Sequence, residues 1–149
     1  MKGTDAVMNN ITKFKILKPA NEVFEAFVDP SKIKNFWFSS SSERWEQGKV
    51  ITLEYDLFDA QLNIEIVEIE ENRKIAFKWG ANGEGHIVRI LLNNLDHEST
   101  IIEVIEEGFK EDDVDQLLDN KEGWVFMLSC LKGYLEFGVD KLREGLVKD

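Results

Sequence analysis

The chain has 149 residues, of which 43% are hydrophobic and 32% charged, and this length fits a single domain. Its net charge of −11 argues against binding to nucleic acid or to an anionic membrane surface. A single cysteine excludes an internal disulfide, and no apolar run is long enough to suggest a membrane span. We therefore expect a cytoplasmic protein. Its four Trp, two Tyr and ten Phe indicate a bulky core or an aromatic-lined cavity.

The N-terminal part of the chain is predicted to form a strand followed by two short helices. Residues 1–10 are expected to be a flexible leader, and residues 11–149 a single domain. Alternating apolar residues predict the first strand: Ile11, Phe14 and Ile16. Pro19 ends this strand and opens a helix, since proline suits the first helical turn. Asp29 is expected to cap a second short helix, with Pro30 in its first position.

The middle of the chain is predicted to form an antiparallel sheet. From Gly48 onward the apolar residues recur with a period of two, which is typical of half-buried strands. Further strands are expected at residues 50–57, 62–70, 75–79, 86–93 and 100–107. Short turns connect them, including 80–85 and 95–97, so consecutive strands should pair as hairpins. The total is about six strands, and the serine run at 39–42 is expected to be a loop.

Residues 123–142 predict a long C-terminal helix. Apolar residues recur there at spacings of three and four: Trp124, Leu128, Leu131, Leu135, Val139 and Leu142. The opposite side is polar and is expected to include Arg143. Such a long stripe needs a large partner, so the sheet should curve around this helix in an α+β fold. Either Asp119 or Asn120 is expected to cap the helix or to interrupt it. Cys130 lies in mid-helix without a charged neighbour that would activate it, so we expect it to be buried in the core.

Two stretches of the sequence resemble a known superfamily. The first is Pro19, Ala20, Asn21, Glu22, Val23, Phe24, Glu25, Ala26 and Phe27, followed by Asp29, Pro30, Phe36 and Trp37. The second is Gly123 and Trp124, followed by Leu128, Leu131, Tyr134, Leu135 and Glu136. In order and separation they resemble the START-like superfamily, and within it the family similar to the activator of the heat-shock-protein-90 ATPase.

This resemblance implies a helix-grip fold, in which an antiparallel sheet wraps the C-terminal helix and two short helices close one end. A cavity between sheet and helix is usual in such proteins. Relatives bind lipids, sterols or other apolar molecules there, and some cyclise or hydrolyse their ligand. The namesake co-chaperone domain instead stimulates an ATPase. The fold alone therefore does not define the function.

The candidate ligand-binding residues are bulky side chains on the expected inner strand faces, the entrance segments and the helix. They are Trp37, Phe38, Trp45, Tyr55, Phe58, Phe77, Trp79, His86, Glu106, Trp124, Met127 and Leu131. Small-molecule sites are mostly apolar with a few placed polar groups, and this set has that character. The alternative interpretation is that these side chains simply fill the core.

His86 and Glu106 form the most specific polar candidate. Strand alternation places both on the inner face of the sheet. If the last hairpin pairs Asn93 with Ser99, His86 lies directly opposite Glu106. A buried pair of this kind would orient a ligand carbonyl or act as an acid–base couple. A solvated pair at the sheet margin, or a slip in register, is the alternative.

The leading functional hypothesis is a START-like domain that binds a small hydrophobic molecule such as a lipid and has no assigned catalysis. A co-chaperone-like domain with a chaperone partner in the stress response is one alternative. The other is a cyclase or hydrolase, whose available polar groups would be His86, Glu106, Tyr55 and Tyr134. No cofactor or metal is predicted, because no His or Cys cluster has zinc spacing.

The oligomeric state is left open between monomer and homodimer. Several apolar residues of the C-terminal helix lie off its main stripe: Val125, Phe126, Cys130 and Phe137. They would be covered either by loops of the same chain or by a second copy.

Overall fold

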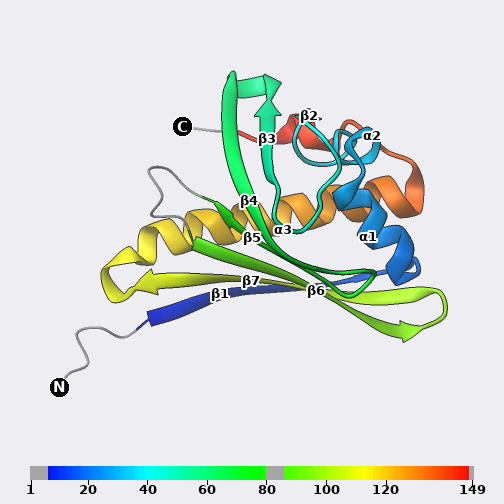
Figure 1. The fold of residues 1–149 in the computed structure, drawn as a ribbon, viewed down its shortest axis with the longest axis horizontal. Helices are drawn as coiled ribbons and strands as arrows, with labels where there is room; N and C mark the ends of the chain where they lie inside the picture. The colour runs from blue at the N-terminus through cyan, green and yellow to red at the C-terminus, as the bar shows by residue number, and fades with distance from the viewer. Residues whose placement is uncertain (1–6, 80–85, 148–149) are drawn as a thin grey trace.

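The computed structural model describes residues 7–79 and 86–147. These residues form one antiparallel sheet, one long helix and two short helices (Figure 1). The beginning of the predicted leader, residues 1–6, and the predicted turn at 80–85 lie outside the described residues. Within the described part of the chain, no helix is long and apolar enough to span a membrane.

The strands are β1 (Val7–Ile16), β2 (Ser40–Ser41), β3 (Val50–Tyr55), β4 (Ala60–Glu70), β5 (Lys74–Trp79), β6 (His86–Asp96) and β7 (Ser99–Lys110). The α-helices are α1 (Ala20–Val28), α2 (Pro30–Ile33) and α3 (Val114–Phe137). Three 3₁₀ turns, η2 (Asp56–Phe58), η4 (Glu111–Asp113) and η5 (Leu142–Gly145), complete the described structure. The order across the sheet is β1-β7-β6-β5-β4-β3-β2, and the paired neighbours are antiparallel.

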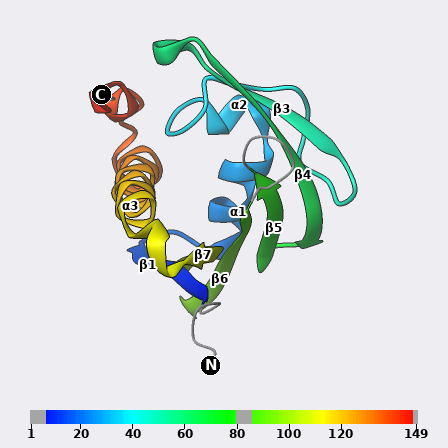
Figure 2. The same ribbon diagram turned by 90° about the vertical axis from the view of Figure 1, so that its left-hand side faces the viewer.

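The sheet curves around α3, as the predicted helix-grip fold requires (Figure 2). Helix α3 lies along the concave side, and α1 lies between α3 and the strands β4 and β5. The α+β class, the long C-terminal helix and the two short helices after the first strand are confirmed.

The sheet has seven strands rather than six, because part of the predicted serine loop pairs with the edge of β3. Ser40 lies opposite Glu54, and its hydroxyl donates to the Glu54 carboxylate at 3.0 Å. The Ser39 hydroxyl donates to the backbone oxygen of Glu54 at 2.8 Å. Small polar residues can therefore add a two-residue strand to an exposed sheet edge, and such a strand has no apolar pattern from which it could be predicted.

The predicted strand faces agree with the observed burial. The inward side chains are at most 1% exposed in the centre of the sheet: Ile51, Leu53, Ile64, Ile66, Ile75, Phe77, Val88, Ile90 and Ile102. Leu62 and Trp79 are partly buried against the same core. Strand β1 begins at Val7, so the last part of the predicted leader belongs to the sheet.

Local hydrogen bonds explain where the second short helix, α2, begins. The Asp29 carboxylate accepts from the backbone N–H of Ser31 at 2.9 Å and from its hydroxyl at 2.7 Å. Pro30 follows Asp29 in the first helical position. The predicted cap of the second helix is thus confirmed.

Helix α3 is displaced toward the N-terminus relative to its prediction. It begins at Val114, before the predicted start at Gly123, so Asp119 and Asn120 neither cap nor interrupt it. It ends at Phe137 because Gly138 adopts a left-handed conformation (φ 68°) that returns its N–H to Tyr134 at 3.0 Å. Val139 and Leu142, which were expected on the apolar stripe, therefore lie beyond the helix and are 40% and 47% exposed.

Cys130 is buried in the core, as expected for a packing residue. Burial raises the pKa of its thiol to about 11, which suppresses the reactive thiolate at neutral pH. We expect no measurable alkylation of the native protein by iodoacetamide at pH 8, and complete alkylation in urea. Mass spectrometry of the intact protein measures both. Modification of the native protein at the rate of a free thiol would contradict this burial.

Candidate functional site

A cavity of about 160 Å³ lies between α3, the end of α2 and the sheet. The described residues that line it include six aromatic side chains and, at its edge, one carboxylate, that of Asp119. The lining residues are Phe36, Trp37, Tyr55, Trp79, Asp119, Asn120, Gly123, Trp124, Phe126, Met127 and Leu146.

Three tryptophans from different elements form one wall of this cavity. Trp79 of β5 and Trp124 of α3 are stacked, with ring centroids 4.9 Å apart. Trp37, which follows α2, meets Trp79 at 6.2 Å and Trp124 at 5.7 Å, edge to face. These separations lie in the favourable range for aromatic pairs. Segments far apart in the sequence are therefore joined by ring contacts at the cavity.

Glu106 of β7 lies behind two of these tryptophans and is fully buried. Its Oε1 accepts the indole N–H of Trp124 at 2.8 Å, and its Oε2 accepts that of Trp79 at 3.0 Å. The side-chain amide of Asn120 donates to both oxygens, at 3.2 and 3.1 Å. Both oxygens act as acceptors, which is the hydrogen-bonding pattern of a carboxylate. Glu106 thus fixes the orientation of two tryptophans of this wall and of the amide beside them.

His86 contacts Glu106, although the predicted strand register is wrong. Glu106 pairs with Val88, two residues from the predicted partner. The connection is three residues shorter than assumed, since Asp96 and not Asn93 lies opposite Ser99, and an irregularity between Asn94 and Asp96 reduces the net register shift to two residues. A two-residue shift keeps both side chains on the same face. The pair is therefore diagonal, with His86 Nδ1 3.3 Å from Glu106 Oε2.

Gly108 allows β7 to pass close to the His86 ring. It has a φ of 101°, and a Cβ at this position would lie 3.4 Å from His86 Cδ2. The strand continues through Phe109 to Lys110, beyond its predicted end at residue 107. The centroid of the Phe109 ring lies 4.3 Å from that of the His86 ring, and the two rings meet edge to face.

The predicted site residues separate into two groups. The cavity is lined by Trp37, Tyr55, Trp79, Trp124 and Met127. The others pack around it without lining it: Phe38, Trp45, Phe58, Phe77, Leu131, His86 and Glu106. Trp45, for example, lies in the core with its ring 5.5 Å from that of Phe77.

Several lining residues were not predicted: Phe36, Asp119, Asn120, Gly123, Phe126 and Leu146. Asn120 is one helical turn before Trp124, so extending the helical periodicity toward the N-terminus would have placed both on one face. Leu146 carries no such signal, because it reaches the cavity only after the chain has turned back beyond α3.

The segment after α3 is held over the cavity by Arg143, which is only 7% exposed (Figure 1, red). Its Nε donates to the backbone oxygen of Trp37 at 2.8 Å, and its Nη2 to Asp56 at 3.1 Å. The guanidinium lies 4.9 Å from the centre of the Tyr55 ring, and the Tyr55 hydroxyl donates to the Arg143 backbone oxygen at 3.1 Å. Arg143, expected on the polar side of the helix, instead holds Leu146 against the cavity.

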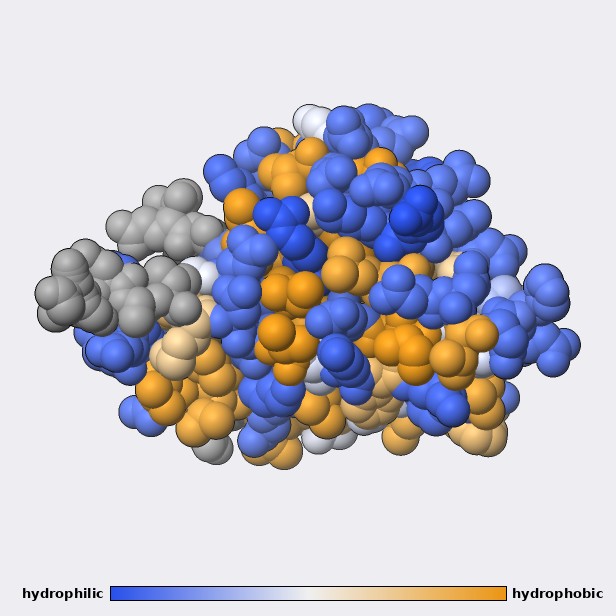
Figure 3. All heavy atoms as spheres, turned by 90° about the horizontal axis from the view of Figure 1, so that it is seen from below, coloured by the Kyte–Doolittle hydropathy of each residue, from blue (hydrophilic) through white to orange (hydrophobic). Residues whose placement is uncertain are grey.

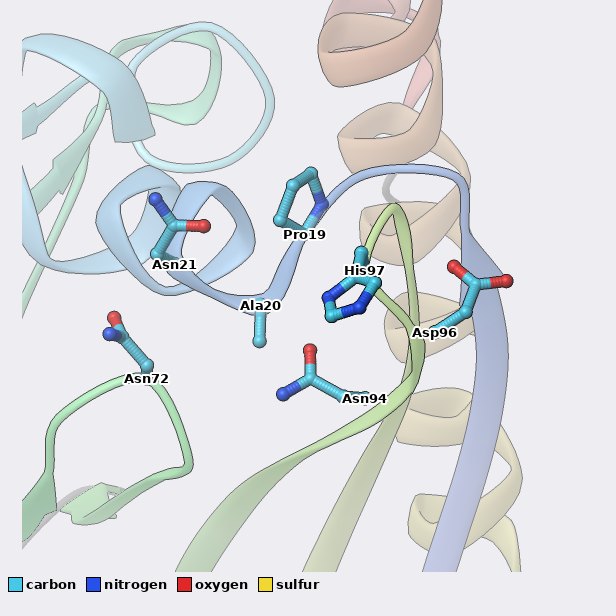
Figure 4. A pocket seen from close by; sticks show the side chains of 7 residues that line it. All are labelled: Pro19, Ala20, Asn21, Asn72, Asn94, Asp96 and His97. Atoms are coloured by element: carbon cyan, nitrogen blue, oxygen red, sulfur yellow. The ribbon is translucent and has the colours of Figure 1, made fainter.

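A second hollow lies on the surface between the start of α1, the β4–β5 turn and the β6–β7 hairpin (Figure 4). It is open, has a volume of about 770 Å³, and is lined by Pro19, Ala20, Asn21, Asn72, Asn94, Asp96 and His97. Most of these side chains are solvated amides and charged groups. The aromatic cavity is less open than this hollow and has the mostly apolar lining that small-molecule sites usually have, so we take it as the candidate site.

A curved antiparallel sheet that grips a long helix, with a cavity between them, defines a START-like helix-grip domain. The chain belongs to the family of Activator of Hsp90 ATPase homolog 1-like proteins, whose sequence model matches residues 18–136. No curated protein gives a significant match to the chain.

Solved structures agree with this family. Protein SSP2350 from Staphylococcus saprophyticus is 55% identical with a TM-score of 0.82, covering 89% of this chain and 95% of that protein. The Aha1 dimer from Colwellia psychrerythraea is 16% identical with a TM-score of 0.78, covering 88% and 98%. DynU16, from the dynemicin biosynthetic locus, is 24% identical with a TM-score of 0.76, covering 89% and 48%. The latter two likenesses show the fold alone.

Proposed function

We propose that this protein binds a small, largely apolar ligand in the aromatic cavity between α3 and the sheet. The observation that carries this proposal is a cavity of about 160 Å³ whose tryptophan walls are held open by the buried Glu106. In another protein, an apolar cavity of about 150 Å³ binds benzene. The ligand, or the part of it that enters the cavity, is accordingly about the size of one aromatic ring.

Rigid walls support binding because little conformational entropy is lost when a ligand enters. Trp79 and Trp124 are fixed twice, by their mutual stacking and by their hydrogen bonds to Glu106. Glu106 has both oxygens occupied by donors and does not line the cavity. Its role in this proposal is to position the walls, with His86 as one further partner, rather than to act as an acid–base couple.

Gly123 provides a direct test, because it lies in α3 at the edge of the cavity. A Cβ added there meets nothing within 4 Å, so a larger side chain can project into open space. We expect Gly123→Leu to obstruct the cavity and to weaken binding of toluene at least ten-fold. Gly123→Ala is the control; it should bind as the wild type does and gain about 1 kcal/mol from helix propensity.

Toluene binding is measured from the indole N–H signals in ¹H–¹⁵N spectra. Those of Trp37, Trp79 and Trp124 should shift, whereas that of Trp45, which packs against Trp37 without lining the cavity, should shift least. Equal toluene affinity in Gly123→Leu and Gly123→Ala, or no shift in the wild type, would overturn the proposal.

A further inference from the structure

The polar side chains of the cavity have most of their N–H and O–H donors already committed. The indole N–H groups of Trp79 and Trp124 donate to Glu106. The Asn120 amide donates to the same carboxylate, and the Tyr55 hydroxyl donates to the backbone oxygen of Arg143. The two indoles and the hydroxyl therefore have no hydrogen left to donate to a ligand. Asn120 keeps one, because its two contacts go to the two oxygens of one carboxylate and use the same N–H.

The remaining polar groups are mainly acceptors. Asp119 is exposed at the edge of the cavity and offers a carboxylate. Asn120 offers a ligand its carbonyl oxygen and its second N–H. Among the described lining side chains, the donors left are this N–H and the indole N–H of Trp37, and both are neutral. The charged lining group is thus an acceptor, so a ligand gains most by donating hydrogens to it.

The charged groups around the cavity also favour a cationic ligand over an anionic one. Among the residues that the structure describes, its lining contains no Lys, Arg or His, and the buried Glu106 carboxylate lies directly behind the tryptophans. The nearby cation Arg143 is engaged by Trp37, Asp56 and the Tyr55 ring. Aromatic ring faces attract cations, and the net charge of −11 adds a long-range bias against anions.

We propose that the ligand is a small aromatic or cyclic amine, bound as its ammonium form. Its ring lies among the tryptophans, and its ammonium group lies at the cavity edge, where it donates to Asp119 and to the Asn120 carbonyl oxygen. This inference rests on the proposed function and specifies the class of ligand that the same cavity takes. It excludes fatty acids and other carboxylates as preferred ligands.

Three probes of one ring size test it: toluene, benzylamine and benzoate, titrated at pH 7 and 150 mM salt. We expect benzylammonium to bind at least about ten-fold more tightly than benzoate, with toluene between them. Asp119→Asn should weaken benzylammonium binding about two- to five-fold and leave toluene unchanged. Asp115→Asn is the matched control, since it removes the same charge one turn earlier on α3, outside the cavity lining.

The outcomes separate the two proposals. If toluene binds and benzoate binds as tightly as benzylammonium, the amine inference is overturned while the ligand-binding function stands. If none of the probes shifts the cavity tryptophans, the proposed function itself is overturned. If Asp119→Asn and Asp115→Asn have equal effects, the cation is attracted by general surface charge, and its placement at Asp119 is wrong.

Discussion

Replacing Glu106 by alanine is expected to lower the free energy of unfolding by about 3–5 kcal/mol. The substitution leaves the indole N–H groups of Trp79 and Trp124 and the amide of Asn120 without their acceptor. Unpaired buried donors are costly, because in the unfolded chain water bonds to them. Urea denaturation followed by circular dichroism measures the change.

Glu106→Gln tests whether the loss of stability comes from the missing hydrogen bonds or from the missing side-chain volume. Glutamine has nearly the same volume, keeps one acceptor oxygen and turns the other position into a donor, so we expect an intermediate loss of about 1–3 kcal/mol. Glu103→Ala, on the outer face of the same strand, should change stability by less than about 0.5 kcal/mol. If Glu106→Ala is no more harmful than Glu103→Ala, the carboxylate does not hold the tryptophans.

This network also shows what strand patterns reveal and what they omit. Alternation identified Trp79, His86 and Glu106 as inward residues, because the side-chain period of a strand is independent of its partner. Which residues face each other depends on the turn, and the tight pairing of Asp96 with Ser99, together with the irregularity between Asn94 and Asp96, shifts the register by two residues. His86 and Glu106 are still in contact because a register shift of two residues keeps both side chains on the same face of the sheet.

The C-terminal region was harder to predict from sequence. The apolar repeat from Trp124 to Leu142 continues past Gly138 as if the helix did. A left-handed glycine ends a helix whatever the apolar pattern beyond it, and the chain then turns back. Arg143 consequently moved from an expected solvent face to a buried site, which only tertiary contacts determine. Asn120 was not predicted as a lining residue because the predicted helix began at Gly123, whereas α3 begins at Val114.

Replacing Arg143 by leucine is expected to release the segment after Gly138 and to lower the free energy of unfolding by about 2–3 kcal/mol. Leucine removes the donor to the buried backbone oxygen of Trp37 and the cation over the Tyr55 ring. The released segment carries Leu146 away from the cavity, so the Trp37 and Trp124 side chains become more accessible. Hydrogen exchange of residues 139–147 should accelerate, and acrylamide should quench tryptophan fluorescence more strongly than in the wild type.

Asp56→Asn is the control that distinguishes the backbone contact from the ion pair. The hydrogen bond from Arg143 lowers the pKa of Asp56, so this pair is fully formed above the ordinary carboxyl pKa and is lost as the pH falls through the lowered value. Asp56 is 67% exposed, however, and solvent screens the attraction. We therefore expect Asp56→Asn to leave the denaturation midpoint and the exchange rates unchanged. Equal effects of the two substitutions would show that the ion pair, and not the bond to Trp37, fastens the segment over the cavity.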